Sequence, residues 1–151
     1  MPVLVITGSQ ADHLALDEIL NGSESDWELV RVESVPIALN LMREESFPIV
    51  ICDRELDVDS WRNVIQGAPK ETAVIVASRF ADDSLWAEAL NLGAYDVLAK
   101  PFDKQEAYRV VDSAWRHWIA SRTETHQART GRAAGGMVAA AIWAFVGLCG
   151  A

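Results

Sequence analysis

Short apolar runs alternate with helical patterns along most of the chain. Runs rich in β-branched residues are typical of strands buried on both faces, and the segments between them carry apolar positions three and four residues apart, as helices do. The five predicted strands span residues 3–6, 27–32, 49–52, 73–77 and 95–98. This alternation predicts an α/β domain with a doubly wound, five-stranded parallel sheet of flavodoxin-like topology.

Capping residues stand before the predicted helices. Ser9 with Asp12 resembles a capping box, and Asn21-Gly22 ends the helix that it opens. The later helices are predicted to begin at Ser34, near Trp61, at Asp82 or Asp83, and at Asp103.

Charge divides the chain of 151 residues into unequal parts. Residues 1–112 hold 9 Lys and Arg against 21 Asp and Glu, whereas residues 133–151 hold no charged residue. We therefore predict an acidic domain over 1–121, a basic polar linker over 122–132 and an apolar, Ala/Gly-rich tail over 133–151 that is helical. The net charge of −9 argues against nucleic acid as a partner.

The tail leaves the localisation open between two alternatives. As a helix it would reach ~28 Å, close to the hydrocarbon thickness of a bilayer. Its small residues suit packing on the domain or on a partner equally well. Because the start has no signal-peptide pattern and only two cysteines occur, we expect a cytoplasmic protein, with membrane association through residues 133–151 as the alternative.

Chemistry-bearing residues follow four of the predicted strands. Ligands of open α/β sheets bind outside the carboxyl ends of the strands. The residues at these ends are Thr7-Gly8, Asp53, Ser78 and Lys100. A carboxylate, a hydroxyl and an ammonium group together can hold a phosphoryl group.

From about Pro2 to Trp118, the chain resembles the receiver domains of response regulators in two-component signalling. The resemblance is carried by the stretches IVICDREL, AVIVASR and NLGAYDVLAKPF. The resemblance implies that Asp53 is the phosphoacceptor, Ser78 the switch hydroxyl and Lys100 the counter-ion of the phosphoryl group. It also implies a cis Lys100-Pro101 bond. The implied partners are a sensor kinase or other signalling proteins.

One departure from the family concerns the metal. The family has two adjacent acids after the first strand, which hold Mg²⁺, and this sequence has Thr7-Gly8 there. Only Asp53, the Glu55 carbonyl and water then remain as ligands, so we expect a degenerate site with weak Mg²⁺ binding. Asp12, inside the first helix, is expected to point elsewhere.

A second departure concerns the aromatic residues. The family's switch aromatic falls at Val97, and the candidate here is Tyr95, two residues earlier and predicted to lie on the same strand face. Trp86 and Trp115 flank the fifth strand on a face that serves docking and dimerisation in the family. We expect them to form an interaction surface, with a homodimer as one outcome.

These patterns predict a stand-alone, receiver-like signalling module of a phosphorelay, which is not an enzyme and is phosphorylated weakly or not at all at Asp53. A working phosphoacceptor is the first alternative. A flavodoxin-like small-molecule binder or enzyme is the second, and it is disfavoured because GSQAD after the first strand holds a single glycine.

Overall fold

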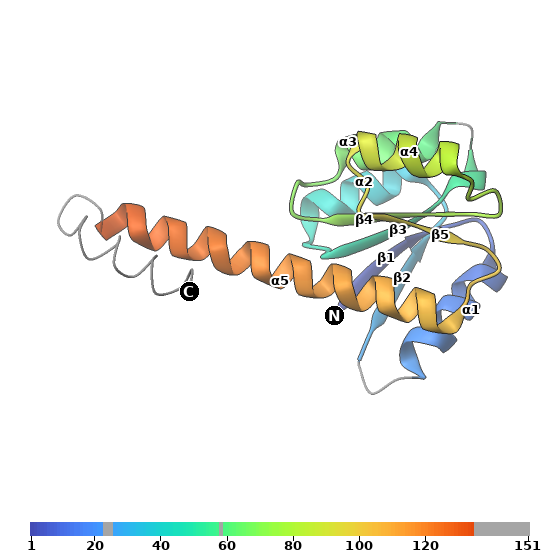
Figure 1. Ribbon diagram of the computed structural model, residues 1–151, viewed down its shortest axis with the longest axis horizontal. Coiled ribbons are helices and arrows are strands. Elements are labelled where there is room, and N and C mark those ends of the chain that lie inside the picture. Colours follow the sequence, from blue (N-terminus) through green and yellow to red (C-terminus); the bar gives the residue numbers. More distant parts are fainter. Residues whose placement is uncertain (23–25, 58, 135–151) are drawn as a thin grey trace. The chain divides into compact units, whose positions relative to one another are not determined.

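The computed structural model describes residues 1–22, 26–57 and 59–134, and the predicted tail over 133–151 therefore lies almost wholly outside the described residues. Helices and strands alternate along the chain as the sequence predicts (Figure 1). The elements are β1 (Pro2–Ile6), α1 (Gln10–Asn21), β2 (Glu28–Val32), α2 (Val35–Glu44), β3 (Ile49–Asp53), η1 (Arg54–Leu56), α3 (Ser60–Gly67), β4 (Ala73–Ser78), α4 (Asp83–Leu92), β5 (Asp96–Ala99) and α5 (Lys104–Ala134).

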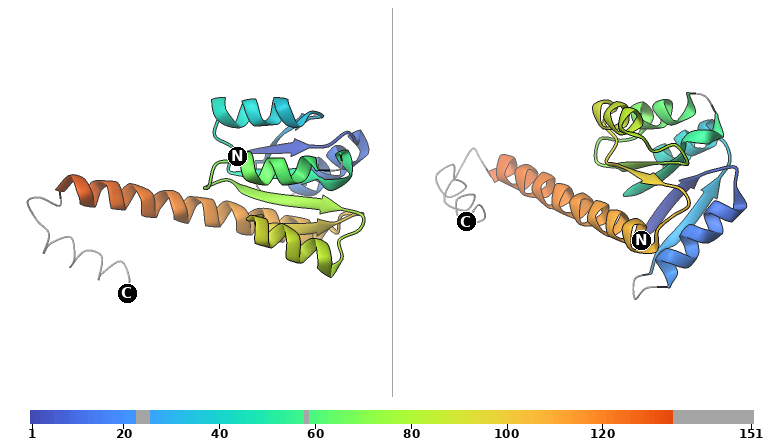
Figure 2. Two further views of the ribbon diagram at one scale, coloured as in Figure 1. Left: turned by 90° about the horizontal axis from the view of Figure 1, so that it is seen from above. Right: turned by 45° about the vertical axis from the view of Figure 1, so that its right-hand side comes forward.

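The five strands form one parallel sheet in the order β2-β1-β3-β4-β5, which confirms the predicted fold class. Helices α1 and α5 cover one face of the sheet, and α2, α3 and α4 cover the other (Figures 1 and 2). The strand order reverses between β1 and β3, so the carboxyl ends of these strands border the crevice where such folds bind ligands.

Two apolar clusters, one on each face, account for the packing of the sheet. Every residue of β3 and β4 is buried, as expected for strands covered on both faces. Leu16 and Leu20 of α1 pack on one face with Val111 of α5, while Trp61 of α3 and Leu85 of α4 pack on the other. Removal of this apolar surface from water is the main force that holds the layers together.

Local signals set the ends of the helices. The Ser9 side chain accepts a hydrogen bond from the Asp12 backbone N–H, and the Asp82 side chain accepts one from Leu85. Gly93 ends α4 at φ 108°, a left-handed conformation that glycine adopts without strain. Lys100-Pro101 is a cis peptide bond, in agreement with the resemblance.

The last helix is longer than the sequence pattern indicated. Met1–Trp118 forms one compact unit, and Ile119–Ala151 forms a second. Residues 122–132, predicted as a linker, have helical backbone as part of α5. The segment contains no proline, and Glu124, Gln127 and Ala128 are good helix formers, which explains why the helix continues. Among the described residues, no helix is long and apolar enough to cross a membrane.

Candidate functional site

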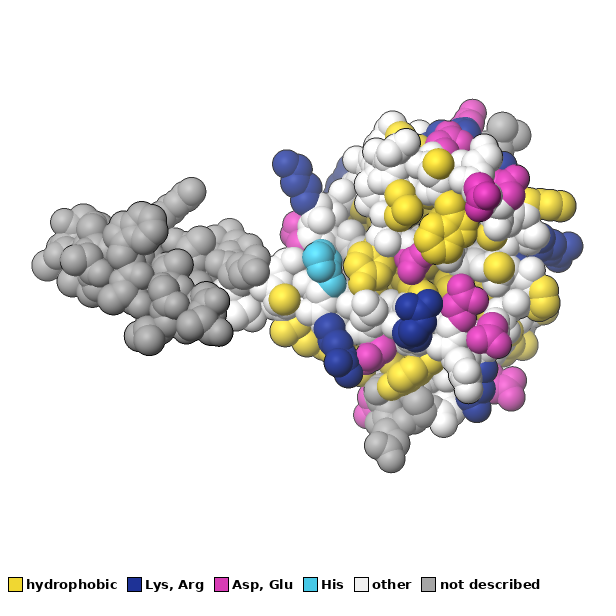
Figure 3. All heavy atoms as spheres, in the orientation of Figure 1, with side chains coloured by type: hydrophobic (Ala, Val, Ile, Leu, Met, Phe, Trp, Pro, Cys, Tyr) yellow, Lys and Arg dark blue, Asp and Glu magenta, His cyan; other side chains and the backbone are white. Residues whose placement is uncertain are grey.

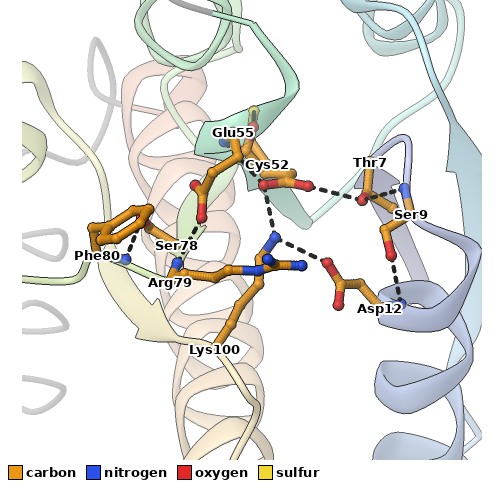
Figure 4. A network of polar contacts seen from close by, with 10 residues as sticks. Thr7, Ser9, Asp12, Cys52, Glu55, Ser78, Arg79, Phe80 and Lys100 are labelled. Carbon is orange, nitrogen blue, oxygen red and sulfur yellow. Dashed lines mark hydrogen bonds and ion pairs between the residues drawn. The ribbon is translucent and has the colours of Figure 1, made fainter.

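The predicted site residues gather at the carboxyl edge of the sheet. Asp53 is the last residue of β3, Ser78 the last of β4, and Lys100 directly follows β5. Asp53 pairs in register with Ala77, so Ser78 lies one residue beyond it on the neighbouring strand. The Lys100 Nζ lies 2.8 Å from Asp53 Oδ1, which confirms the predicted clustering (Figure 4).

Lys100 joins two carboxylates. Its ammonium donates to Asp53 Oδ1 at 2.8 Å and to Asp12 Oδ2 at 2.9 Å, and its side chain is only 6% exposed. Burial alone would lower the pKa of Lys100, but the hydrogen bonds and negative charges of Asp53 and Asp12 outweigh it, so the pKa is raised. The ammonium therefore keeps its charge at neutral pH.

Both oxygens of the Asp53 carboxylate are engaged. Oδ1 accepts from Lys100 and from the Glu55 backbone N–H, and Oδ2 accepts from the Thr7 hydroxyl at 3.0 Å. Thr7 is buried, and its Oγ1 in turn accepts from the Ser9 backbone N–H. Thr7 thus links the start of α1 to the carboxylate, and it holds the position where the family has an acid.

The expectation that Asp12 points elsewhere is wrong. Asp12 lies in the first turn of α1, and this end of the helix meets the carboxyl edge of the sheet. Its carboxylate contacts Lys100 from the α1 side of the site, whereas Ser78 lies on the other side of Lys100 (Figure 4). A helix that follows a strand by a three-residue loop begins at that strand's end, and this was the signal in the sequence that could have placed Asp12.

The turn after β4 is tied to the segment after β3. The backbone N–H of Arg79 donates to Glu55 Oε1 at 2.6 Å, and the backbone N–H of Phe80 donates to Ser78 Oγ at 3.0 Å (Figure 4). Glu55 was expected to contribute its carbonyl to a metal, whereas its side chain makes this contact across the edge. Ser78 is fully buried, and its hydroxyl lies beside the same turn.

Cys52 lies directly before Asp53 and behind the site. Its side chain is fully buried, and its Sγ lies 3.9 Å from the Asp53 carbonyl oxygen. Burial, together with the negative charge of Asp53, raises the pKa of the Cys52 thiol to about 12. The thiol is therefore protonated and unreactive at neutral pH.

The donor set at this edge does not fit Mg²⁺. The ion requires oxygen ligands in near-octahedral geometry, preferably with carboxylates among them. Here Thr7 and Gly8 supply no charge, and the oxygens of Asp53 and Asp12 are hydrogen-bonded to Lys100 and Thr7. Within the described ranges, no group of three or more His, Cys, Asp and Glu residues could hold a metal ion.

Tyr95 does not lie where the sequence placed it. It precedes β5, and its ring packs with the cluster on the α1 and α5 side, whereas Val97 packs with the cluster on the other face. The Tyr95 hydroxyl hydrogen-bonds to Ser113 Oγ at 2.6 Å, and its ring lies against His117 of α5. The expectation of a shared strand face is wrong because the period of two begins only at Asp96.

The two tryptophans of the predicted interaction face differ in their surroundings. Trp115 is half-buried, with its ring centroid 5.9 Å from that of Trp27 and 5.3 Å from that of Trp118. Trp86 on α4 is 38% exposed, and Phe80 and Leu90 are exposed beside it in the sequence. Figure 3 shows hydrophobic atoms gathered on the face that carries α4. Packing accounts for Trp115, and Trp86 remains the candidate contact residue.

A small cavity of about 10 Å³, room for about one water molecule, borders Thr7, Asp12, Asp53 and Lys100. Sites for drug-sized ligands measure roughly 300–1,000 Å³. This cavity has no room for a nucleotide or flavin, which weighs against the small-molecule alternative.

The comparisons with known proteins agree with this geometry. The family model described as "Response regulator receiver domain" matches residues 3–112. No curated protein matches the chain. Solved structures similar to the chain include a signal receiver domain of an HD domain-containing protein from Pseudomonas fluorescens, with 24% identity, a TM-score of 0.69, and coverage of 81% of this chain and 91% of that one.

Two further structures show the same fold. A response regulator from Thermotoga maritima has 23% identity and a TM-score of 0.65, with 76% of this chain and 97% of that chain covered. NtrX from Brucella abortus has 22% identity and a TM-score of 0.72, and the likeness covers 86% of this chain but 30% of that larger one.

Proposed function

Because the chain belongs to the response regulator receiver family, we propose that it works as a receiver-like signalling module of a phosphorelay in which Mg²⁺-dependent phosphorylation at Asp53 is weak or absent. Receiver domains are signalling modules of two-component systems, and they interact with kinases and other signalling proteins. They typically bind Mg²⁺ at the phosphorylation site. We propose that this chain departs from the family in binding Mg²⁺ weakly or not at all.

One observation carries the proposal: the Asp53 carboxylate, at the family's phosphoacceptor position, is fully hydrogen-bonded to Lys100, Thr7 and the Glu55 backbone. A carboxylate held by a cation and a hydroxyl is already stabilised without a metal. In phosphoryl transfer, metal ions neutralise the charge that develops on the transferring oxygens. With Thr7-Gly8 in place of two acids, this neutralisation falls to Lys100 alone.

The proposed roles of the other residues follow from their positions. Ser78, buried at the end of β4, is the candidate switch hydroxyl, and Lys100 is the candidate counter-ion of a phosphoryl group. The exposed side chains of Phe80, Trp86 and Leu90 support a protein-contact surface, with a signalling partner or a second copy as the occupant. Attachment of residues 133–151 to a membrane, and function without an output domain, remain predictions.

The test is phosphorylation by a small phosphodonor. The full chain is incubated with phosphoramidate with and without Mg²⁺, and Asp53→Asn serves as the control for the acceptor. Intact-mass spectrometry measures the phosphorylated fraction. We expect little or no gain of a phosphoryl group, and little dependence on Mg²⁺. Rapid, Mg²⁺-dependent and Asp53-dependent phosphorylation would contradict the proposal.

A working phosphoacceptor is the second candidate, and the position of Asp12 favours it. Asp12 brings a second carboxylate to the site from α1, although Lys100 now holds it. If Asp12 turns to a metal, then Asp12→Asn abolishes Mg²⁺-dependent phosphorylation. The same phosphoramidate assay distinguishes the two candidates.

A further inference from the structure

Three hydrogen-bond donors lie around the end of β4 and β5. They are the Lys100 ammonium, the Ser78 hydroxyl and the Arg79 backbone N–H (Figure 4). An ammonium carries three protons, and two of those of Lys100 go to Asp12 and Asp53. A backbone amide, a hydroxyl and an ammonium group at one edge of the sheet suit the oxygens of a phosphoryl group.

One of these donors is already taken by an anionic side chain. Glu55 Oε1 accepts the Arg79 N–H at 2.6 Å, a length typical of a charge-assisted hydrogen bond. The backbone N–H of Glu55 donates to Asp53 Oδ1 at 3.0 Å, so the residue is anchored beside the acceptor carboxylate. Figure 4 shows its side chain reaching from the segment after β3 to the end of β4.

We propose that the Glu55 carboxylate is a built-in occupant of the anion position at this edge, and that it competes with a phosphoryl group on Asp53 for the Arg79 amide. The inference rests on the proposed function, because it concerns the regulation of the same site. Two anionic oxygens cannot share one N–H without strong repulsion at contact distance. Phosphorylation of Asp53 and the Glu55–Arg79 contact therefore exclude each other.

The competition has a structural consequence. The Arg79 amide belongs to the turn that leads into α4, and Phe80 in this turn is 66% exposed. Glu55 itself is exposed, so it can leave the amide and be solvated by water at little cost. Release of Glu55 would uncouple the turn after β4 from the segment after β3. Glu55 would thus act as a latch that an incoming phosphoryl group opens.

The experiment measures anion binding in a protein that cannot be phosphorylated at residue 53. The full chain carries Asp53→Asn, which removes the phosphoacceptor and the charge that would repel a free dianion. Into this background are placed Glu55→Ala, Glu55→Gln and the control Glu71→Gln, an exposed acid in the loop before β4 that removes the same charge elsewhere. Each protein is titrated with sulfate at constant ionic strength without Mg²⁺, and the Arg79 amide is followed by ¹H–¹⁵N NMR.

We expect Glu55→Ala to move the Arg79 amide resonance upfield before sulfate is added, and to bind sulfate about tenfold more tightly than the background protein. Glu55→Gln, which keeps a neutral acceptor, falls between them, and Glu71→Gln matches the background. The proposal is overturned if the Arg79 amide does not respond to Glu55→Ala, if no variant gains sulfate binding, or if Glu71→Gln gains as much. Because sulfate transfers no phosphoryl group, these results do not depend on whether Asp53 can be phosphorylated.

Discussion

The two sides of the carboxyl edge differ from the receiver family to different degrees. On the side of β3, β4 and β5, an acid, a hydroxyl and a lysine stand at the strand ends, as in the family. On the side of β1 and α1, the acids of the family are replaced by Thr7 and Gly8, and the nearest carboxylate is Asp12 in the first turn of the helix. The first side provides hydrogen-bond donors for an anion, whereas the Asp12 carboxylate of the second side is paired with Lys100.

The difference shows that the two tasks of such a site are separable. Holding an anion requires donors and a cation, and Lys100 supplies the cation from the intact side. Holding Mg²⁺ requires charged oxygen ligands that are not already bound, which the β1 side lacks. The Asp12 carboxylate is a second partner of Lys100, so one ammonium group is shared by two carboxylates at this site.

The largest expected effect is on Mg²⁺ affinity, when two acids are introduced after β1. Thr7→Asp with Gly8→Asp should tighten Mg²⁺ binding by about a thousandfold, since each carboxylate contributes ~1.4–2.8 kcal/mol. The backbone at Gly8 has room, because an added Cβ would meet only Leu56 Cδ1, at 3.4 Å. Titration calorimetry measures the affinity. Thr7→Asn with Gly8→Asn is the control of equal size, and an equal gain in that variant would show that charge is not the missing feature.

The next effect concerns the side that is intact. Lys100→Met leaves Asp53 and Asp12 without their shared cation, and breaking a buried ion pair costs ~3 kcal/mol or more. We expect the melting temperature to fall by ~10 °C. Lys104→Met, which changes an exposed lysine of α5, is the control and should have little effect.

A second variant separates charge from packing at Lys100. When Asp53→Asn is added to Lys100→Met, the unpaired buried charge is removed, so part of the lost stability should return. Thermal melts of the single and double variants give the coupling. If the double variant is less stable than Lys100→Met by the full cost of Asp53→Asn alone, the ion pair does not organise the site.

The comparison of the two sides also shows which parts of the site could be predicted from the sequence. Asp53, Ser78 and Lys100 were found because they directly follow strands, and parallel strands fix where their carboxyl ends lie. Asp12 and the Glu55 carboxylate were missed because their contacts depend on the reach of a side chain from the next element, which spacing alone does not give. The predicted strand face of Tyr95 was wrong for a related reason. Side chains alternate between the two faces only within the hydrogen-bonded strand, and Tyr95 precedes β5.

Helix boundaries show the same limit in the fold. Every predicted helix except the third was given a capping residue at its start, and the structure confirms the caps at Ser9 and Asp82. The end of α5 was not predicted, although Gly135-Gly136 follow Ala134 in the sequence. A change in charge near residue 122 was interpreted as the start of a linker, but the helical backbone continues through Gly131 to Ala134, because a change in charge does not by itself end a helix.

A smaller difference is expected between the two residues that hold the β1 side together. Thr7→Val removes a buried hydroxyl that both donates to Asp53 and accepts from Ser9, which should cost ~2 kcal/mol of unfolding free energy. Asp12→Asn keeps an oxygen that can accept from Lys100 on a side chain that is 23% exposed, and should cost ~1 kcal/mol or less. Urea unfolding measures both. The reverse order would mean that Asp12, rather than Thr7, organises this side.

The smallest effect concerns Cys52, behind the intact side, and it appears only at alkaline pH. The pKa of its thiol is raised from 9.0 to about 12 in the folded protein by burial and by the charge of Asp53. Above pH 9 the unfolded chain loses this proton while the folded chain keeps it, so stability falls as pH rises, and the contribution is fully present only below about pH 9. Between pH 8 and pH 10 the loss should be ~1 kcal/mol. Urea unfolding of a Cys149→Ser chain, with and without Cys52→Ala, measures it: the decline should be shallower once Cys52 is gone, and parallel declines would mean that the thiol ionises equally in both states.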